Sequence, residues 1–221
     1  MSEFASRRLF PWHSFDLTSE LPQNWASDVV SIARSHAKAR ELQPTSVTSR
    51  EHTSELRLPV LTVGGVTVKE RLPWLDQLYR TRILQLGQSI TSEVLTVARD
   101  QRYAINLNVQ KGRTHRYECH VDSNPVEGLL YVTTHPPGQG GELVVSNLGD
   151  VAGVDVVRSD ATRIYPVSGQ LIFFDARLNS HFVEPLQDDA SIRVVVAFNF
   201  YTTSCSEEDR PEDLNRHLGL E

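Results

Sequence analysis

Between residues 103 and 201 the sequence is a succession of short apolar segments separated by residues that favour turns. The expected strands cover 103–109, 117–121, 128–134, 142–146, 162–166, 170–175, 181–185 and 193–201. Glycine, proline, asparagine and aspartate separate them, most densely in HPPGQGG at 135–141. Seven or eight short strands with such turns predict a sandwich or barrel, of which the jelly roll is one form. The sequence contains neither long parallel crossovers nor a glycine-rich phosphate loop, which argues against a Rossmann-type sheet.

The first hundred residues have a different pattern, which predicts two helices at about 24–39 and 72–98. Trp25, Val29 and Ile32 share one face of the first, and apolar residues at 75, 79, 83, 86 and 90 share one face of the second. The polar stretch 43–55 between them is expected to be a mobile loop. We therefore expect one domain over 1–221, with helical support and a lid at 1–100, a β core at 101–203 and an acidic tail at 204–221.

Composition limits the environment and the partners of the chain. Its formal net charge is −6, which argues against a nucleic-acid or anionic-membrane partner because both require a basic face. The two cysteines, Cys119 and Cys205, do not make a disulfide framework in 221 residues. The N-terminus lacks the apolar region of a signal peptide, and no apolar run approaches the roughly 20 residues that span a bilayer. These features predict a cytoplasmic protein with reduced thiols.

The segment YECHVDS places His120 and Asp122 two positions apart. Residues i and i+2 of a strand point to the same side of a sheet, so an imidazole and a carboxylate should project together. His181 opens another expected strand. Two histidines and one carboxylate form the facial ligand set of non-haem Fe(II). A lone H-x-D is a weak signal, however, because the chain has eight histidines and His120 could equally be a histidine of the core.

Arg193 begins an otherwise apolar strand, VVVAFNFY, twelve positions after His181. A guanidinium at the mouth of an apolar strand requires an anionic partner, and its planar fork matches a carboxylate with two hydrogen bonds. The alternative is an edge-strand arginine paired with Asp188 or Asp189 of this chain.

Taken together, these segments resemble the Fe(II)/2-oxoglutarate-dependent oxygenase superfamily, in particular its prolyl-hydroxylase-like branch. The matching pieces, in family order, are HVD at 120–122, GLLYVTT at 128–134, GGEL at 140–143, GQLIFFDARLNSHFVEP at 169–185 and Arg193. The resemblance implies a mainly β fold with N-terminal helices (α+β), whose core is a cupin-like, jelly-roll double-stranded β-helix. It implies that His120, Asp122 and His181 are the catalytic metal site for Fe(II), and that Arg193 binds the distal carboxylate of 2-oxoglutarate. Dioxygen is then the oxidant, and ascorbate is a candidate reductant.

One residue departs from the family pattern, because many members have a serine two positions after this arginine and Val195 stands there. Tyr131, Asn106 and Asn108 are candidates to supply the missing contact to the cosubstrate. Asn199 should face the interior, since it lies an even number of positions from Arg193. Asn199 and Arg116 are the candidates for binding substrate.

The resemblance implies a dioxygenase that hydroxylates an unactivated C–H bond and releases succinate and CO2. Asp122 makes halogenation unexpected, because the related halogenases lack this carboxylate, but desaturation and ring closure stay open. We expect a small-molecule substrate, such as a free amino acid or a natural-product intermediate. A peptidyl, prolyl-type hydroxylase, a cupin with a further ligand, and a non-catalytic ligand-binding or sensor domain on the same scaffold are the alternatives. The oligomeric state is open, with a homodimer as one candidate.

Overall fold

The computed structural model describes residues 10–42, 46–52 and 57–217. Its larger sheet has eight strands in the order β1-β10-β7-β12-β5-β3-β2, with β4 also paired to β12. These strands are β1 (His13–Asp16), β2 (Lys38–Leu42), β3 (Leu58–Val63), β4 (Leu95–Val97), β5 (Ile105–Lys111), β7 (Val126–Tyr131), β10 (Gln170–Phe174) and β12 (Ile192–Thr202). Every pairing in the sheet is antiparallel.

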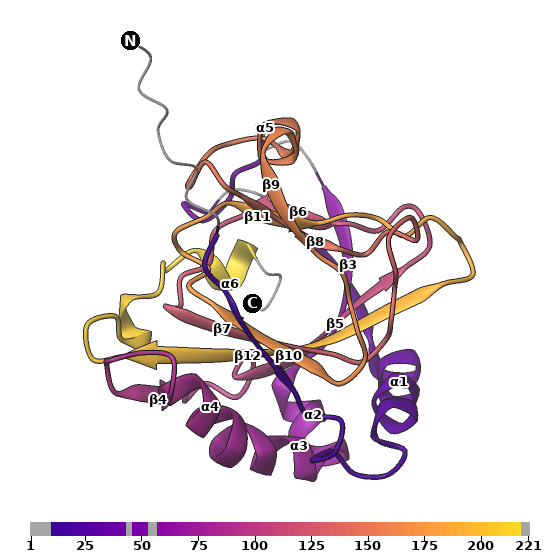
Figure 1. The fold of residues 1–221 in the computed structure, drawn as a ribbon, viewed down its shortest axis with the longest axis vertical. Coiled ribbons are helices and arrows are strands. Elements are labelled where there is room, and N and C mark those ends of the chain that lie inside the picture. The colour runs from indigo at the N-terminus through magenta and orange to yellow at the C-terminus, as the bar shows by residue number, and fades with distance from the viewer. Residues whose placement is uncertain (1–9, 43–45, 53–56, 218–221) are drawn as a thin grey trace.

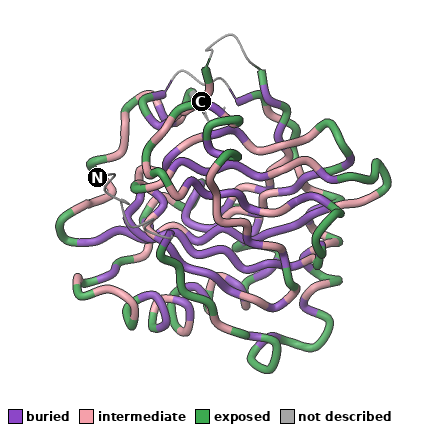
Figure 2. Tube along the Cα trace, turned by 45° about the horizontal axis from the view of Figure 1, so that its top comes forward, coloured by how far each residue is buried: buried purple, intermediate pink, exposed green. Residues whose placement is uncertain are grey.

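A four-stranded antiparallel sheet, in the order β6-β11-β8-β9, lies across from the larger one (Figure 1). Its strands are β6 (Tyr117–His120), β8 (Leu143–Ser146), β9 (Ala161–Ile164) and β11 (His181–Val183). Apolar side chains from the inner faces of both sheets form one buried cluster, which includes Leu129, Leu143 and Phe174. Figure 2 shows that buried residues follow the strands while exposed residues gather in the connections. This mainly β, antiparallel arrangement is the double-stranded β-helix expected from the sequence.

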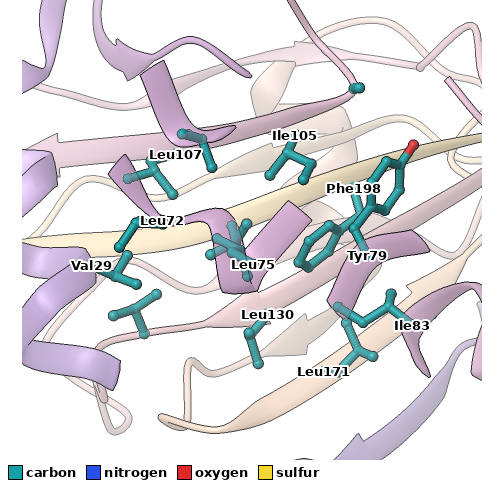
Figure 3. Close-up of a cluster of buried hydrophobic side chains, with 14 of the residues drawn as sticks. Val29, Leu72, Leu75, Tyr79, Ile83, Ile105, Leu107, Leu130, Leu171 and Phe198 are labelled. Carbon is teal, nitrogen blue, oxygen red and sulfur yellow. The ribbon is translucent and has the colours of Figure 1, made fainter. Parts of the chain in front are cut away.

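Helices cover the outer face of the larger sheet (Figure 1). They are α1 (Trp25–His36), α2 (Gly65–Arg71), α3 (Pro73–Leu78), a π-helical turn (Tyr79–Ile83) and α4 (Leu84–Gln88). Leu75, Tyr79 and Ile83 are fully buried there, and the Tyr79 ring stacks on Phe198 of β12 with 5.6 Å between centroids. Figure 3 shows this helix-to-sheet contact. The helical pattern in the sequence therefore marks the layer that supports the sheet from outside.

The second helical region is shorter than the expected 72–98 and is divided into several pieces. The Gln88 side chain explains its end: Nε2 donates to the carbonyls of Thr91 and Glu93, and Oε1 accepts from the Leu95 N–H. These contacts turn the chain out of the helix, and residues 95–97 then pair with β12. Within the first hundred residues, β1 to β4 also join the sheet, so this region is not purely helical.

Two further short helices lie near the small sheet and the C-terminus, α5 (Val154–Ser159) and α6 (Leu214–His217). None of the helices in the described ranges combines the length and the apolar character needed to span a bilayer. The expected loop 43–55 lies partly outside the described residues. Its described portion, 46–52, is attached to β6: the Val121 N–H donates to the Thr48 carbonyl at 2.9 Å, and the Arg50 N–H to the Cys119 carbonyl at 2.7 Å.

Candidate active site

His120, Asp122 and His181 come together between the two sheets, and their ligand atoms all lie within 4.8 Å of one another. The pairing of β6 with β11 sets His181 directly opposite His120. Asp122 follows the end of β6, where its N–H donates to the Ala176 carbonyl at 2.9 Å. Its two carboxylate oxygens lie 3.3 Å from His120 Nε2 and 3.5 Å from His181 Nε2. The structure therefore brings together the three side chains that the sequence analysis named.

Both histidines are oriented by backbone carbonyls. His120 Nδ1 lies 2.8 Å from the Glu118 carbonyl, and His181 Nδ1 lies 3.0 Å from the Asn179 carbonyl. Since a carbonyl only accepts, each Nδ1 carries the proton and each Nε2 presents its lone pair to the shared point. Such fixed tautomers are typical of histidines that bind metals.

The charges of the three groups depend on one another. Burial opposes the ionised form of both His120 and Asp122. The hydrogen bond and charge of Asp122 outweigh burial and raise the pKa of His120 to about 9. In return, His120 and His181 hold the pKa of Asp122 below its usual value. A carboxylate kept ionised beside two imidazoles is a suitable donor set for a divalent cation, which would take the place of the shared proton.

Arg193 lies in the same cavity and is 2% exposed. Neither its Nε nor its Nη2 has a hydrogen-bond partner among the described residues. Asp188 and Asp189 do not pair with it: they accept from the N–H groups of Ala190 and Arg113 instead. Burial lowers the pKa of Arg193. Two buried, unused donors on one guanidinium fit a carboxylate ligand, because a buried charge without a partner is costly.

Tyr131 lies beside this guanidinium, with Arg193 Cζ 5.6 Å from the centre of its ring. Its hydroxyl is buried and also has no hydrogen-bond partner in the described part of the chain. Burial raises the pKa of Tyr131 to about 12, so the hydroxyl keeps its proton and can donate. Tyr131 is directly opposite Val195, the residue that replaces the expected serine. A second donor is thus available where this chain lacks the serine of the family pattern.

The asparagines expected at the site all line the cavity, which has a volume of about 160 Å³. Asn106 and Asn199 donate their amide groups to the Tyr103 carbonyl, at 3.1 and 2.6 Å. Asn108 is opposite Val195 on the side away from Tyr131. Asn106 is opposite Ala197, which is four positions along β12 from Arg193, so it lies farther from the guanidinium than Asn108 does.

Arg116, expected to contact substrate, does not line the cavity. Its guanidinium donates to both carboxylate oxygens of Glu51, at 2.7 and 3.0 Å, and thereby joins segment 46–52 to β6. Glu127 is a lining residue that the sequence analysis did not single out. Its signal is its spacing from Tyr131, because positions 127, 129 and 131 of β7 share one face.

Comparison with known proteins agrees with this geometry. Residues 101–201 match the family model of the 2OG-Fe(II) oxygenase superfamily. No curated protein matches the sequence. Among solved structures, the non-heme alpha ketoglutarate dependent carbocyclase SnoK from nogalamycin biosynthesis has a TM-score of 0.63 at 14% identity. That alignment covers 98% of this chain and 90% of the carbocyclase.

Two other similar structures have a TM-score of 0.58. The alpha ketoglutarate dependent epimerase SnoN is 12% identical, over 86% of this chain and 78% of its own. A prolyl hydroxylase from Trichoplax adhaerens, solved with a hypoxia inducible factor peptide fragment, is 16% identical over 90% and 85%. The epimerase has also been solved with Fe3+, alpha ketoglutarate and nogalamycin RO. Residues 101–201 are therefore similar in sequence to the 2OG-Fe(II) oxygenase superfamily, whose cofactors are Fe(II), 2-oxoglutarate and O2, and the fold agrees with that class.

Proposed function

We propose that the protein is a 2-oxoglutarate-dependent dioxygenase that hydroxylates an unactivated C–H bond of a small molecule. The supporting observation is that three converging side chains able to bind a metal open onto the same cavity as a buried guanidinium, two of whose nitrogens have no hydrogen-bond partner among the described residues. A free amino acid or a natural-product intermediate is the proposed substrate class. Succinate and CO2 are the proposed co-products.

His120, Asp122 and His181 would hold Fe(II), and Arg193 would hold the distal carboxylate of 2-oxoglutarate, with the Tyr131 hydroxyl as a further donor. Iron and cosubstrate, when bound, would supply the oxidation. One oxygen atom of O2 would enter succinate as 2-oxoglutarate loses CO2, and the other would be inserted into the substrate C–H bond. The carbonyls of Glu118 and Asn179 keep the imidazoles oriented throughout.

The rest of the cavity wall excludes water and positions the substrate. Apolar side chains line its middle, among them Leu129, Phe174 and Val183. Arg210 and Leu214, from the C-terminal segment, line it as well. A small cavity with walls from both sheets and from the C-terminal segment favours a small molecule over a long peptide.

A peptidyl hydroxylase is the second candidate, because the similar Trichoplax adhaerens enzyme was solved with a peptide fragment. The carbocyclase and the epimerase also show that this scaffold is found in proteins named for other reactions. The mass of the product separates these outcomes: hydroxylation adds one oxygen atom, ring closure by dehydrogenation removes two hydrogens, and epimerisation leaves the mass unchanged.

The test is anaerobic loading with Fe(II) and 2-oxoglutarate, followed by admission of O2 with amino acids, small metabolites or proline-containing peptides. Substrate-dependent succinate release with an oxygen-containing product supports the proposal. Binding of 2-oxoglutarate without any succinate release would instead indicate a non-catalytic binding domain. A purified protein that binds neither Fe(II) nor 2-oxoglutarate would contradict the proposal as a whole.

A further inference from the structure

Glu127 is a buried carboxyl group on the cavity wall that has no role in the proposed chemistry so far. It is 7% exposed and lines the cavity. The cluster of possible metal ligands consists of His120, Asp122 and His181 and does not include Glu127, so Glu127 is not a fourth ligand in this arrangement. Its one described hydrogen bond comes from the Asn124 amide, at 3.0 Å to Oε2. Within the described part of the chain, no lysine, arginine or histidine forms an ion pair with it.

The position of Glu127 in the sheet separates it from the expected cosubstrate site. Tyr131, beside Arg193, and Glu127 are on the same strand and the same face, four residues apart. At about 3.4 Å per residue they are separated by roughly 13 Å. On the neighbouring β12, Asn199 is opposite Glu127. Glu127 and Asn199 therefore line one end of the cavity, while Arg193 lines the other, with Tyr131 packed beside its guanidinium.

Besides the Asn124 amide that donates to Glu127, two asparagines that line the cavity present hydrogen-bond acceptors. Asn106 and Asn199 both turn their amide nitrogens to the Tyr103 carbonyl, which fixes the orientation of each amide. Their side-chain carbonyl oxygens are then the ends left to accept from a ligand. Arg210 lines the same cavity but is engaged elsewhere: its Cζ lies 3.6 Å from the centre of the Tyr103 ring, and its Nη1 donates to Asn215.

Charge balance points in the same direction. In the loaded centre, Fe(II) is balanced by Asp122 and one carboxylate of 2-oxoglutarate, and Arg193 balances the other carboxylate. The centre would then be formally neutral, so neither iron nor 2-oxoglutarate would supply a counterion for the Glu127 carboxyl. Burial, with the charge of Asp122 adding to it, raises the pKa of Glu127 well above its usual value. Because no described residue forms an ion pair with it, the ionised form of this buried carboxyl is best stabilised by a cation that the ligand brings.

We propose that Glu127, with the carbonyl oxygens of Asn106 and Asn199, forms a subsite for a protonated amine of the substrate. This inference rests on the proposed oxygenase function and specifies its substrate class: a small molecule with a basic nitrogen. An ammonium group has three N–H donors and no acceptor, which matches a carboxylate flanked by amide oxygens. The amine lies at the end of the cavity remote from Arg193.

The experiment measures binding by calorimetry to the full-length protein, kept anaerobic and loaded with Fe(II) and 2-oxoglutarate. The probes are L-lysine, agmatine, putrescine and spermidine, each beside its N-acetylated form, in which an amine has lost its charge. At least one amine should bind wild-type protein more tightly than its acetylated form. Glu127→Gln should weaken that amine by about tenfold or more, because a charge-assisted contact becomes a neutral one.

The matched control is Glu70→Gln, which removes the same charge from an exposed position on α2. It should leave amine binding unchanged. Affinities for Fe(II) and 2-oxoglutarate should stay at wild-type levels in both variants, which separates this inference from the oxygenase proposal. A panel in which no amine binds better than its acetylated form contradicts the subsite. A Glu127→Gln variant that keeps its amine affinity also contradicts the subsite. The same holds for a variant that loses only Fe(II) or 2-oxoglutarate affinity, because Glu127 would then act through its hydrogen bond with Asn124 and not through the amine.

Discussion

Replacing Arg193 by leucine should reduce 2-oxoglutarate affinity sharply without harming the folded protein. Two guanidinium nitrogens, Nε and Nη2, are buried and have no described partner. If each donates one charge-assisted hydrogen bond at about 1.5 kcal/mol, the loss is about 3 kcal/mol. That corresponds to a rise in the Kd for 2-oxoglutarate of roughly a hundredfold or somewhat more.

The same substitution should have the opposite effect on the ligand-free protein. Leucine removes a buried charge that forms no ion pair with the described residues, so the Tm of the apo protein should be equal to or higher than that of wild type. Most core substitutions lower stability, and a gain in stability together with a loss of ligand is characteristic of a binding residue.

Calorimetry with the anaerobic Fe(II) protein measures the first effect, and thermal unfolding of the apo protein measures the second. 2-Oxobutyrate, which lacks the distal carboxylate, is the matched ligand: its affinity should change little in Arg193→Leu. Arg34→Leu, at an exposed position on α1, is the control substitution. An Arg193→Leu protein that binds 2-oxoglutarate within about twofold of wild type would refute the assigned anchor, since even one lost neutral hydrogen bond exceeds that.

Three further outcomes are expected. His181→Ala should weaken Fe(II) or Mn(II) binding more than about a hundredfold, as seen by titration, and abolish turnover, because one of three donors is gone. Tyr131→Phe should raise the Kd for 2-oxoglutarate about fivefold with little change in Tm, whereas Tyr79→Phe should lower stability by about 1–3 kcal/mol in urea and leave that Kd unchanged. The contrast arises because the Tyr131 hydroxyl has no described partner, while that of Tyr79 donates to the Asn199 carbonyl and accepts from the Ala98 N–H. Gly128→Ala should cost about 1–3 kcal/mol in the same assay, since its Cβ would lie 2.9 Å from a Phe173 ring carbon.

The strands of the β core were predictable because turn residues bound them and their pattern is regular. The same reasoning missed β2, whose sequence KAREL is mostly polar and continues the helical pattern of α1. Its extended conformation comes from antiparallel pairing with β3, a contact between residues distant in the sequence. Propensity is a weak guide at such a position, because tertiary pairing overrides it.

The site residues that could be predicted are those whose sequence signal lies within a short segment. His120 and Asp122 are two residues apart, and the surrounding segments carry the resemblance that brought in His181 and Arg193. The partner of Arg116 could not be found in the same way, since Glu51 lies in a segment without a recognisable pattern. Glu127 was missed because the expected strand began at residue 128, whereas β7 begins at Val126 and includes Glu127.

The attachment of residues 46–52 to β6 also determines which border of the small sheet is open to other chains. β6 is a terminal strand of that sheet, and a terminal strand normally offers its backbone as a template for self-association. Backbone contacts from Thr48, Ser49 and Arg50 occupy that border next to His120. Strand-to-strand assembly through this sheet would therefore have to begin at β9, two strands away from β11 and three from β6. Aggregates or domain-swapped forms growing there would leave the strands that carry His120 and His181 unobstructed.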